Sequence, residues 1–469
     1  MFTYCPECLK KQQRINELEE EIVRLKARLR YQERTVEEGF FGSSTPSSKL
    51  PVKPNTLSER RARCGGAKPG HPGHGRASFS TTEAHHTQPV ELPDQCPFCG
   101  ATLQPKEFLD RSVLDAKPLE IHKVVYRLER KRCPRCHRAL RARAPKVLPK
   151  ALLSNRLLAH MAVEHYLRGI TLGHLQEQTG IGSGTLVQAF HQLAQRLNTV
   201  PERLVEEYRQ ALVKHADETG WSNDGQNGHA WLFATLWTSI FRFRHTRSAS
   251  VPKELFGEYP LPGTLVVDRY AAYNKAPCYI QYCYCHLSRD VQDIQKQFPN
   301  EPEVHRFVDT LVPLLTDAIQ LRSLPISNKQ FLRRAASLKQ NILSVVHRDA
   351  RHPAVQTLQN IFRANPHRLY HWARDRTIPA DNNLAERDFR PLVIARKISF
   401  GSQSERGART REILMTVLHT LKKRLHGPSA DVHDALCLAL DRIAEDPSLD
   451  PFRLLFPTNP ITSYPQTPS

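Results

Sequence analysis

The sequence predicts a multidomain α/β protein in which a strand-rich core is interrupted by a helical insertion. Three observations support this fold class. Paired cysteines in the first third of the chain indicate a small metal-binding module, strand-like alternation dominates residues 208–290, and residues 301–375 show helical periodicity without strand alternation. A chain of 469 residues has room for about three domains and at least one sizeable core.

The chain is strongly basic. Lys and Arg number 67 against 47 acidic residues, which gives a formal net charge of +20. This excess favours a polyanionic partner, with nucleic acid first, although a basic enzyme with solvated cations can have the same composition. Residues 1–20 carry no apolar signal segment, and the longest apolar stretch, residues 230–241, is too short to span a bilayer. We therefore expect a cytoplasmic protein with no membrane partner.

Residues 1–38 predict a short coiled coil. Its apolar residues step by three and four along the chain at Ile15, Leu18, Ile22, Leu25 and Leu29. This pattern is typical of an a/d seam and indicates a homodimer, with a helix packed on its own domain as the alternative. Cys5 and Cys8 form an isolated pair that can bind a metal across a dimer or remain as free thiols.

Residues 39–89 predict a flexible basic linker, because they are rich in Ser, Pro and Gly and then alternate cations with Gly and Pro. An extended basic strand of this kind can follow phosphates or enter a minor groove. A simple solvated linker fits the composition equally well. The candidate DNA contacts here are Arg60, Arg61, Lys68 and Arg76.

Two Cys-x-x-Cys pairs predict a zinc-binding domain of the ribbon type at residues 90–148. Together Cys96, Cys99, Cys133 and Cys136 can complete a tetrahedral Zn²⁺ site. The gap between the pairs is longer than usual, but residues 120–130 alternate like a strand and fit a hairpin between them. With no open ligand position and no adjacent acid, the zinc is expected to be structural. The odd cysteine count of 11 also favours metal ligation over a disulfide framework.

Residues 149–205 predict a helical region that contains a helix-turn-helix. A helix, a glycine-containing turn and a second helix capped by Ser183 follow one another between residues 166 and 197. Ser183, Thr185 and Gln188 occupy early polar positions of the second helix and are candidate DNA contacts. An ordinary helical hairpin is the alternative.

Strand signals define the expected core, which comprises residues 206–296 and 376–430. They fall at residues 210–216, 229–237, 239–245 and 264–267. Three meandering strands followed by strands that alternate with helices fit a ribonuclease H-like α/β core. Residues 297–375 form the expected all-helical insertion, and an amphipathic helix at residues 411–424 is expected to cover the core. Residues 431–469 should form a C-terminal helix and a disordered tail.

Two aspartates, Asp217 and Asp268, close short apolar runs, and Glu386 follows much later in the chain. A strand that ends on Asp holds its carboxylate at the sheet edge, and a distant helix can add a third. Such oxygen donors suit two Mg²⁺ or Mn²⁺ ions, which can catalyse phosphodiester chemistry. Taken singly, each acid is more often the polar end of a strand. Asp381 and Asp388 are nearby rivals of Glu386.

Several segments resemble the insertion-sequence sixty-six family of bacterial DDE transposases, of the TnpC type. The resemblance lies in the Cys-x-x-Cys pairs and in Pro69-Gly-His-Pro-Gly-His74, Asp217-Glu-Thr-Gly-Trp221, Val267-Asp-Arg-Tyr-Ala-Ala-Tyr273, Cys285-His-Leu-Ser-Arg289, Asp381-Asn-Asn-Leu-Ala-Glu-Arg-Asp-Phe-Arg390-Pro and Arg396-Lys-Ile-Ser-Phe-Gly-Ser402. It implies a ribonuclease H-like catalytic domain with Asp217, Asp268 and Glu386 as the metal-binding triad. The implied activity is metal-dependent cleavage at transposon ends and transfer of the 3′-OH into target DNA.

The resemblance also implies partners and supporting residues. Double-stranded DNA, from transposon inverted repeats and from the target, is the expected substrate in the bacterial nucleoid, and accessory proteins of the same element are possible partners. Cys283, His286 and Arg289 are candidate catalytic support, with a buried strand and a satisfied His as the alternative. Independently of the resemblance, the cations that closely follow the glutamate are candidate phosphate contacts, namely Arg387, Arg390, Arg396 and Lys397. The alternative is that half of them are solvent-facing helix charges. Two other functions remain open, namely a catalytically inactive DNA-binding protein and a nuclease on the same fold.

Overall fold

The computed structural model describes residues 14–15, 17–19, 21–22, 79–117, 120–425 and 431–457. Ile15, Leu18 and Ile22 of the predicted coiled coil are helical and exposed. The predictions for the rest of that segment and for the basic linker lie outside the described residues. They include those for Cys5, Cys8, Arg60, Arg61, Lys68 and Arg76.

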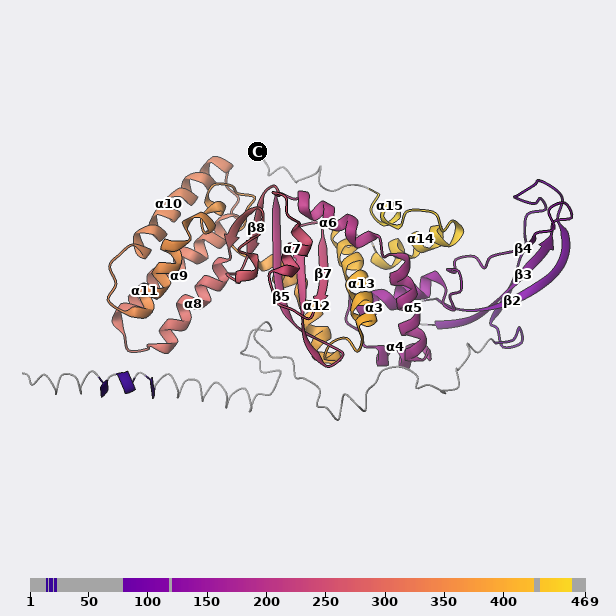
Figure 1. Cartoon of the computed structure of the whole chain (residues 1–469), viewed down its shortest axis with the longest axis horizontal. Helices are drawn as coiled ribbons and strands as arrows, with labels where there is room; N and C mark the ends of the chain where they lie inside the picture. The colour runs from indigo at the N-terminus through magenta and orange to yellow at the C-terminus, as the bar shows by residue number, and fades with distance from the viewer. Residues whose placement is uncertain are drawn as a thin grey trace, which may run out of the picture.

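The described chain forms an elongated mixed α/β molecule with three parts (Figure 1). A long β-hairpin projects from one end, a helix-covered sheet occupies the middle, and a group of helices forms the other end. One hydrophobic core runs through the middle and the helical end, from Leu148 to Phe456. No described helix is both long and apolar enough to cross a membrane.

The projecting hairpin belongs to a small four-stranded sheet with the order β1-β3-β2, in which β4 pairs with β3. Its strands are β1 (His86–Val90), β2 (Gln104–Lys117), β3 (Glu120–Arg132) and β4 (Ala139–Arg141). The hairpin of β2 and β3 fills the long gap between the cysteine pairs, as the alternation predicted. The end of the hairpin near its turn is anchored to the rest of the molecule, because Leu114 exchanges backbone hydrogen bonds with Leu152 (3.0 Å) and Ser154 (2.9 Å). The opposite end of the hairpin is free.

Four helices link the hairpin to the central sheet. They are α3 (Asn155–Tyr166), α4 (Leu172–Thr179), α5 (Ser183–Arg196) and α6 (Val200–Gln210). The pair α4 and α5 has the predicted order of helix, turn and helix, because Gly180 at the end of α4 adopts φ 68° and redirects the chain. The predicted Ser183 cap is wrong. Gly182 is the N-cap, and the Ser183 N–H instead donates to Gln176 Oε1 at 3.3 Å.

The central sheet has five strands in the order β7-β6-β5-β8-β9. They are β5 (Val213–Asn223), β6 (Gln226–Ala234), β7 (Ser239–Arg244), β8 (Thr264–Val267) and β9 (Tyr279–Tyr282). The first three form an antiparallel meander, whereas β5, β8 and β9 are parallel. All four predicted strands are present, and β9 is an addition.

We predicted that the first strand ends on Asp217. The strand β5 instead continues to Asn223. The cause is the hairpin turn at Asp224 and Gly225, which have φ values of 50° and 71°. Two positive φ values in a two-residue Asp-Gly loop match the twist of the flanking strands and extend their pairing. Asp217 therefore lies in the middle of a strand, while Asp268 directly follows β8 as expected.

Helices cover both faces of this sheet. The helices α12 (Asn383–Ser399) and α13 (Glu405–Arg424) pack against β5, β6 and β7. On the other face, the short elements α7 (Ser250–Phe256) and η3 (Ala271–Tyr273) contact the rings of Phe233 and Trp231 on β6. We expected residues 411–424 to form an amphipathic helix that covers the core, but residues 410–421 are all buried, so this stretch has no solvent-facing side. The reason is that α3, α5 and α14 (Val432–Glu445) pack on α13 away from β7.

Polar side chains of α13 accept hydrogen bonds from the backbone of the edge strand β7. The backbone N–H groups of Ser239, Phe241 and Phe243 donate to Thr420 Oγ1 (3.1 Å), Thr416 Oγ1 (3.0 Å) and Glu412 Oε2 (3.2 Å), respectively. Four helical residues rise by about 6 Å and two strand residues by about 6.8 Å, so the two spacings match. This side-chain ladder replaces the strand partner that an edge strand lacks.

The helical end of the molecule comprises most of the segment predicted as a helical insertion. It contains α8 (Tyr284–Gln297), α9 (Pro302–Leu321), α10 (Asn328–Val346) and α11 (Pro353–Ala364), followed by the short turns η4 (Pro366–Arg368) and η5 (His371–Ala373). The helical segment starts earlier than predicted, because α8 follows β9 directly. Cys283 and His286 therefore lie at the start of a helix rather than in a strand. A last short helix, α15 (Pro451–Leu455), follows α14.

The central position of α13 gives a stability prediction. Leu418→Ala should lower the free energy of unfolding by about 2–5 kcal/mol, because Leu418 is fully buried and its truncation leaves a cavity. Leu438→Ala, at a residue of α14 that is 66% exposed, is the matched control and should change it by less than about 0.5 kcal/mol. Urea unfolding followed by circular dichroism compares the two variants, and equal effects would contradict the central role of α13.

Candidate functional site

The structure brings Asp217, Asp268 and Glu386 to one region of the central sheet. Asp217 lies on β5, Asp268 follows the neighbouring strand β8, and Glu386 lies in the first turn of α12. All three side chains are half-buried. Alternation along β5 places Asp217 on the face that α12 covers, since His215 and Thr219 on the same face both contact α12 or its N-cap.

The three carboxylates are close enough for their charges to interact. Burial, together with the charges of Glu218, Asp268 and Glu386, raises the pKa of Asp217 well above its usual value. Like charges that share a site disfavour ionisation unless a cation neutralises them. This electrostatic conflict is what a divalent cation would relieve, and carboxylate oxygens are the ligands that Mg²⁺ and Mn²⁺ prefer.

Asn382 connects the segments that carry these acids. Its Oδ1 accepts a hydrogen bond from His215 Nδ1 (2.9 Å), and its Nδ2 donates to the carbonyl of Ala216 (2.9 Å), both on β5. Its backbone N–H donates to Cys283 Sγ at 3.1 Å, next to the end of β9. Asn382 is fully buried and is the N-cap residue of α12. It therefore fixes the start of the glutamate helix against the strand that carries Asp217.

A second set of contacts holds the loop after Asp268. The buried carboxylate of Glu218 accepts hydrogen bonds from Tyr273 Oη (2.7 Å) and from Arg247 Nη2 (2.5 Å). The Arg247 guanidinium lies over the Tyr270 ring at 4.0 Å. The Tyr270 N–H in turn donates to Asp268 Oδ1 at 2.9 Å. Glu218 thus faces away from Asp217, as expected from the strand period, and positions the loop of the second aspartate.

Residues at the start of α8 approach Glu386. Its Oε1 lies 3.9 Å from His286 Nδ1, and its Oε2 lies 3.6 Å from an Arg289 guanidinium nitrogen. Burial lowers the pKa of His286, while the charges of Asp268 and Glu386 act in the opposite direction. Ligand atoms of Cys283, His286 and Glu386 all lie within 4.8 Å of one another. Both Glu386 Oε1 and His286 Nδ1 are buried without a hydrogen-bond partner among the described residues.

The two rival acids have other partners. Asp388 pairs with Lys423 at 2.5 Å and accepts a hydrogen bond from Ser239 Oγ at 2.7 Å, so it belongs to the contact between α12 and α13. Asp381 Oδ1 accepts the backbone N–H of Asn383 at 2.8 Å and so helps to start α12, although Asn382 occupies the N-cap position. Of the acids in this segment, only Glu386 reaches His286 and Arg289.

The predicted phosphate contacts on α12 divide into two groups. Arg387, Arg390 and Lys397 are exposed, and at 100° per residue they lie about 20° to 100° to one side of Glu386 around the helix. Arg396 lies about 80° to the other side of Glu386, which is the side that faces β5. It is only 2% exposed and donates to Thr219 Oγ1 (2.9 Å) and Gly220 O (2.7 Å), so its prediction as a DNA contact is wrong. Its position about 180° from Arg387 explains the difference.

The residues predicted to contact DNA from the helix-turn-helix lie at the start of α5. Ser183 and Gln188 are exposed, and Thr185 is half-buried. The opposite face of α5, with Leu186, Phe190 and Leu193, is buried in the core. The first turns of α5 therefore leave polar side chains open to solvent, as the pattern predicted.

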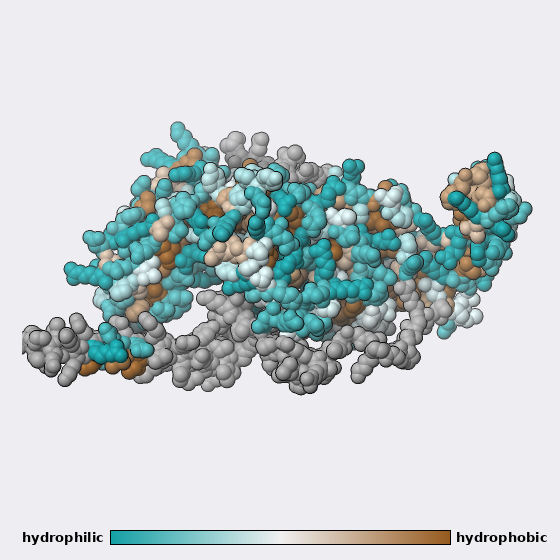
Figure 2. Space-filling view, in the orientation of Figure 1, coloured by the Kyte–Doolittle hydropathy of each residue, from teal (hydrophilic) through white to brown (hydrophobic). Residues whose placement is uncertain are grey.

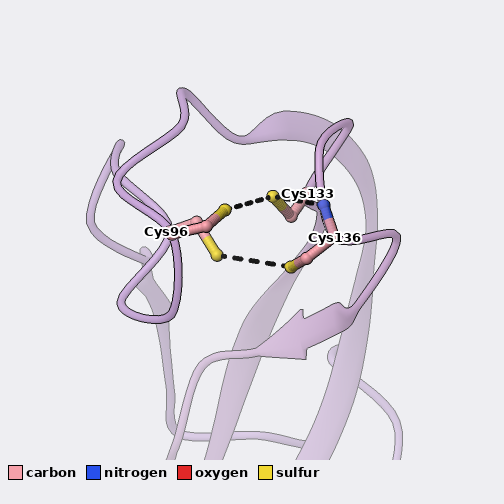
Figure 3. A group of neighbouring side chains, drawn as sticks. Cys96, Cys133 and Cys136 are labelled. Carbon is pink, nitrogen blue, oxygen red and sulfur yellow. Dashed lines mark hydrogen bonds between the residues drawn. The ribbon is translucent and has the colours of Figure 1, made fainter.

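The four predicted zinc ligands meet at the free end of the hairpin (Figure 3). Cys96 Sγ lies 3.9 Å from Cys136 Sγ, and Cys99 Sγ lies 3.1 Å from Cys133 Sγ. Sulfur ligands of a tetrahedral zinc with bonds of about 2.3 Å are separated by about 3.8 Å. The Cys136 N–H donates to Cys133 Sγ, and this backbone hydrogen bond is the main reason that the pKa of the Cys133 thiol is lowered to about 6. The donor set fits structural Zn²⁺.

The two cysteine turns have the same backbone shape. Gly100 and His137, which directly follow the second cysteine of each pair, have φ values of 69° and 56° and donate to the carbonyls of Cys96 and Cys133. Figure 2 shows an apolar patch at this end of the hairpin, where Phe98 of the first turn is 60% exposed. The Arg138 guanidinium lies 4.4 Å from the Phe98 ring centroid.

Several residues that shape the site escaped the sequence analysis. Asn382, His215, Arg247 and Tyr270 act through hydrogen bonds between segments that are far apart in the chain. Only Asn382 gave a local signal, because a buried Asn before a helix is a common N-terminal residue. The sequence did not indicate that Asn382 bonds to β5 and to Cys283.

Comparisons with known proteins find one matching family and distant relatives. A family model described as Transposase IS66 family matches residues 150–410. Uncharacterized protein y4qI of Sinorhizobium fredii (strain NBRC 101917 / NGR234) is 24% identical over 408 residues, which cover 79% of this chain and 74% of the relative. Uncharacterized protein y4jD of the same strain is 24% identical over 216 residues, or 41% of this chain and 40% of the relative.

The cysteine cluster gives a prediction about bound zinc. Cys133→Ser should lower the zinc content of the purified full-length protein by one equivalent and destabilise the hairpin, because a zinc ligand is lost. Cys437→Ser, at a cysteine of α14 outside the cluster, is the matched control and should retain the metal. Elemental analysis measures the zinc content. Equal zinc in both variants would contradict the assignment of the ligands.

The hydrogen bonds of Asn382 give a second prediction. Asn382→Ala should lower the free energy of unfolding by about 1–3 kcal/mol, because it leaves buried groups of β5 without a partner. It should also speed amide hydrogen exchange at the start of α12. Asn341→Ala, at an exposed residue of α10, is the control and should do neither. Unchanged exchange in the Asn382 variant would show that the link to β5 does not fix α12.

Proposed function

Because the chain belongs to the IS66 family of transposases, we propose that it is a DNA transposase that cleaves transposon ends and joins the freed 3′-OH to target DNA. The observation that carries this proposal is the meeting of Asp217, Asp268 and Glu386 from three separate segments. The sheet order of an antiparallel meander followed by two parallel strands supports a ribonuclease H-like catalytic core.

Asp217, Asp268 and Glu386 would hold the catalytic metal. When bound, two Mg²⁺ or Mn²⁺ ions would activate the attacking water or hydroxyl and stabilise the leaving oxygen of the phosphodiester. The residues fit such ions, since Glu386 Oε1 has no hydrogen-bond partner among the described residues and the carboxylates raise the pKa of Asp217. The cysteine cluster would hold a separate structural Zn²⁺, far along the hairpin from these acids.

The protein's own side chains would position the DNA. Arg289, which is 52% exposed, and His286 lie beside Glu386, where they can contact the scissile phosphate or the leaving strand. Arg387, Arg390 and Lys397 extend this basic surface along α12. Asn382 and Glu218 would act by positioning, since each holds a segment that bears an acid.

The rest of the chain supports an assembly on double-stranded DNA. Ser183, Thr185 and Gln188 of α5 would contact transposon ends, and the exposed apolar residues of the N-terminal helix would pair in a homodimer. Accessory proteins of the same element would be further partners.

Strand transfer with the full-length protein tests the proposal. Asp268→Asn should reduce joining of labelled transposon-end DNA about 100-fold or more in the presence of Mg²⁺, because it removes one carboxylate. The variant keeps Oδ1 as an acceptor for the Tyr270 N–H, so the loop should stay folded. Asp309→Asn, at an exposed residue of α9, is the control and should join ends like the wild type.

The products separate the candidate functions. Joined products from the wild type but not from Asp268→Asn support a transposase, whereas cleavage without joining indicates a nuclease on the same fold. Binding of DNA without either product indicates an inactive DNA-binding protein. Undiminished joining by Asp268→Asn would show that the proposed acid site is wrong.

A further inference from the structure

A cavity lies between the edge strand β9 and the helical insertion. Its volume is about 640 Å³, and its walls come from β9, from α10 and from residues 366–374. One buried residue holds two of these walls together. Gln281 Oε1 accepts the N–H groups of His371 (2.9 Å) and Trp372 (3.3 Å), and its Nε2 donates to Leu369 O at 3.2 Å. The cavity is therefore fixed by the fold and is large enough for a small ligand.

The walls of this cavity are basic. Lys339, Arg368 and Arg374 line it together with two histidines, His367 and His371, and no carboxylate is among the lining residues. None of the three permanent cations forms an ion pair with an acid within the described part of the chain. Arg368 instead donates to Tyr282 Oη at 2.6 Å, and Lys339 Nζ lies 5.3 Å from the Tyr370 ring centroid. Cations that share a cavity without counter-ions favour an anionic ligand.

The mouth of the cavity also offers an aromatic face. Tyr279 lines the cavity, is 69% exposed, and contacts the His371 ring at a centroid distance of 5.4 Å. A large aromatic side chain left in solvent beside cations without an acidic partner matches the combination that binds single-stranded nucleic acid, in which bases stack while cations follow the phosphates. A binding site for a free phosphate alone would need no exposed aromatic ring.

The cavity and the acid site share one strand. Tyr279 begins β9, and Cys283, four residues later and roughly 13 Å along an extended chain, begins the segment that bears His286 and Arg289. Asn274, another lining residue, follows Asp268 through η3. A DNA strand held at the acid site could therefore extend along the edge of the sheet into the cavity.

We propose that this cavity binds an unpaired nucleotide of the DNA substrate. Lys339, Arg368 and Arg374 contact the phosphate, and the base stacks on Tyr279. This inference rests on the proposed function, because the ligand is part of the DNA that the acid site would process. It assigns to the helical insertion the role of holding a single-stranded end beside the catalytic residues.

Fluorescence anisotropy with two dye-labelled probes tests the inference. One probe is a blunt DNA duplex, and the other is the same duplex with a short single-stranded thymidine overhang. Binding is measured with the full-length protein without added Mg²⁺, so that no reaction is required. The variants are Lys339→Ala/Arg374→Ala and Tyr279→Ala. The matched control is Arg333→Ala/Arg334→Ala, which removes two exposed cations of α10 outside the cavity.

The Kd for the overhang probe should rise about tenfold in the double cavity variant and at least about fivefold in Tyr279→Ala. Tyr279→Phe should bind like the wild type, because it keeps the stacking ring. The blunt duplex and the control variant should show unchanged binding. Equal losses on both probes would indicate general charge attraction and overturn the inference, as would unchanged overhang binding in both cavity variants.

The outcome is separable from that of the catalytic proposal. Asp268→Asn should bind the overhang probe like the wild type in this assay. A loss of joining with intact overhang binding concerns the acid site alone. A selective loss of overhang binding in the cavity variants supports the cavity even if no strand transfer is detected.

Discussion

The hydrogen bonds of Asn382 are the constraint on which the candidate site depends. A carboxylate triad drawn from a strand, a loop and a helix can act together only if the helix begins at a fixed place on the sheet. Asn382 achieves this by bonding to His215 and Ala216 of β5 and to Cys283 after β9. Because all of these groups are buried, each unmade bond would leave an unsatisfied polar group, which makes the alternative positions of α12 costly.

A second set of hydrogen bonds, between β7 and α13, determines how the elements around the site are arranged. The edge strand β7 bonds to Thr420, Thr416 and Glu412 of α13 instead of to another strand. The charge of Glu412 is balanced by Arg242 at 3.3 Å and Arg244 at 3.0 Å. With its edge satisfied in this way, the sheet can bury α13 on all sides and join the helices α3 to α6 to the part that carries the candidate site through one continuous core.

This arrangement separates three kinds of chemistry along the long axis of the molecule (Figure 1). The hairpin carries the cysteine cluster at its free end, the sheet carries the carboxylates, and the helical insertion contributes the basic cavity. The carboxylates and the cavity meet at β9, where the sheet ends and the insertion begins. Net positive charge on such an elongated body suits contact with DNA at several separate places.

The sequence by itself determined the fold class, the cysteine cluster and the segments that carry the three acids. These features rest on local signals, namely Cys-x-x-Cys spacing, strand and helix periodicity, and the Asp381-Asn-Asn-Leu-Ala-Glu386-Arg387 motif. It also missed a local signal, the Asp224-Gly225 turn that carries β5 past Asp217. Family resemblance, rather than spacing, selected which acids belong together.

Only the tertiary structure decided which side of each element faces the site. Arg396 and Arg387 have the same chemistry on the same helix, yet one is buried against β5 and the other is exposed. Likewise, α13 was predicted as an amphipathic helix over the core, but its polar residues bond to a strand edge more than 160 residues away in the chain. The physical reason is that burial and hydrogen bonding depend on what packs against a face, and those partners come from distant segments that no local pattern encodes.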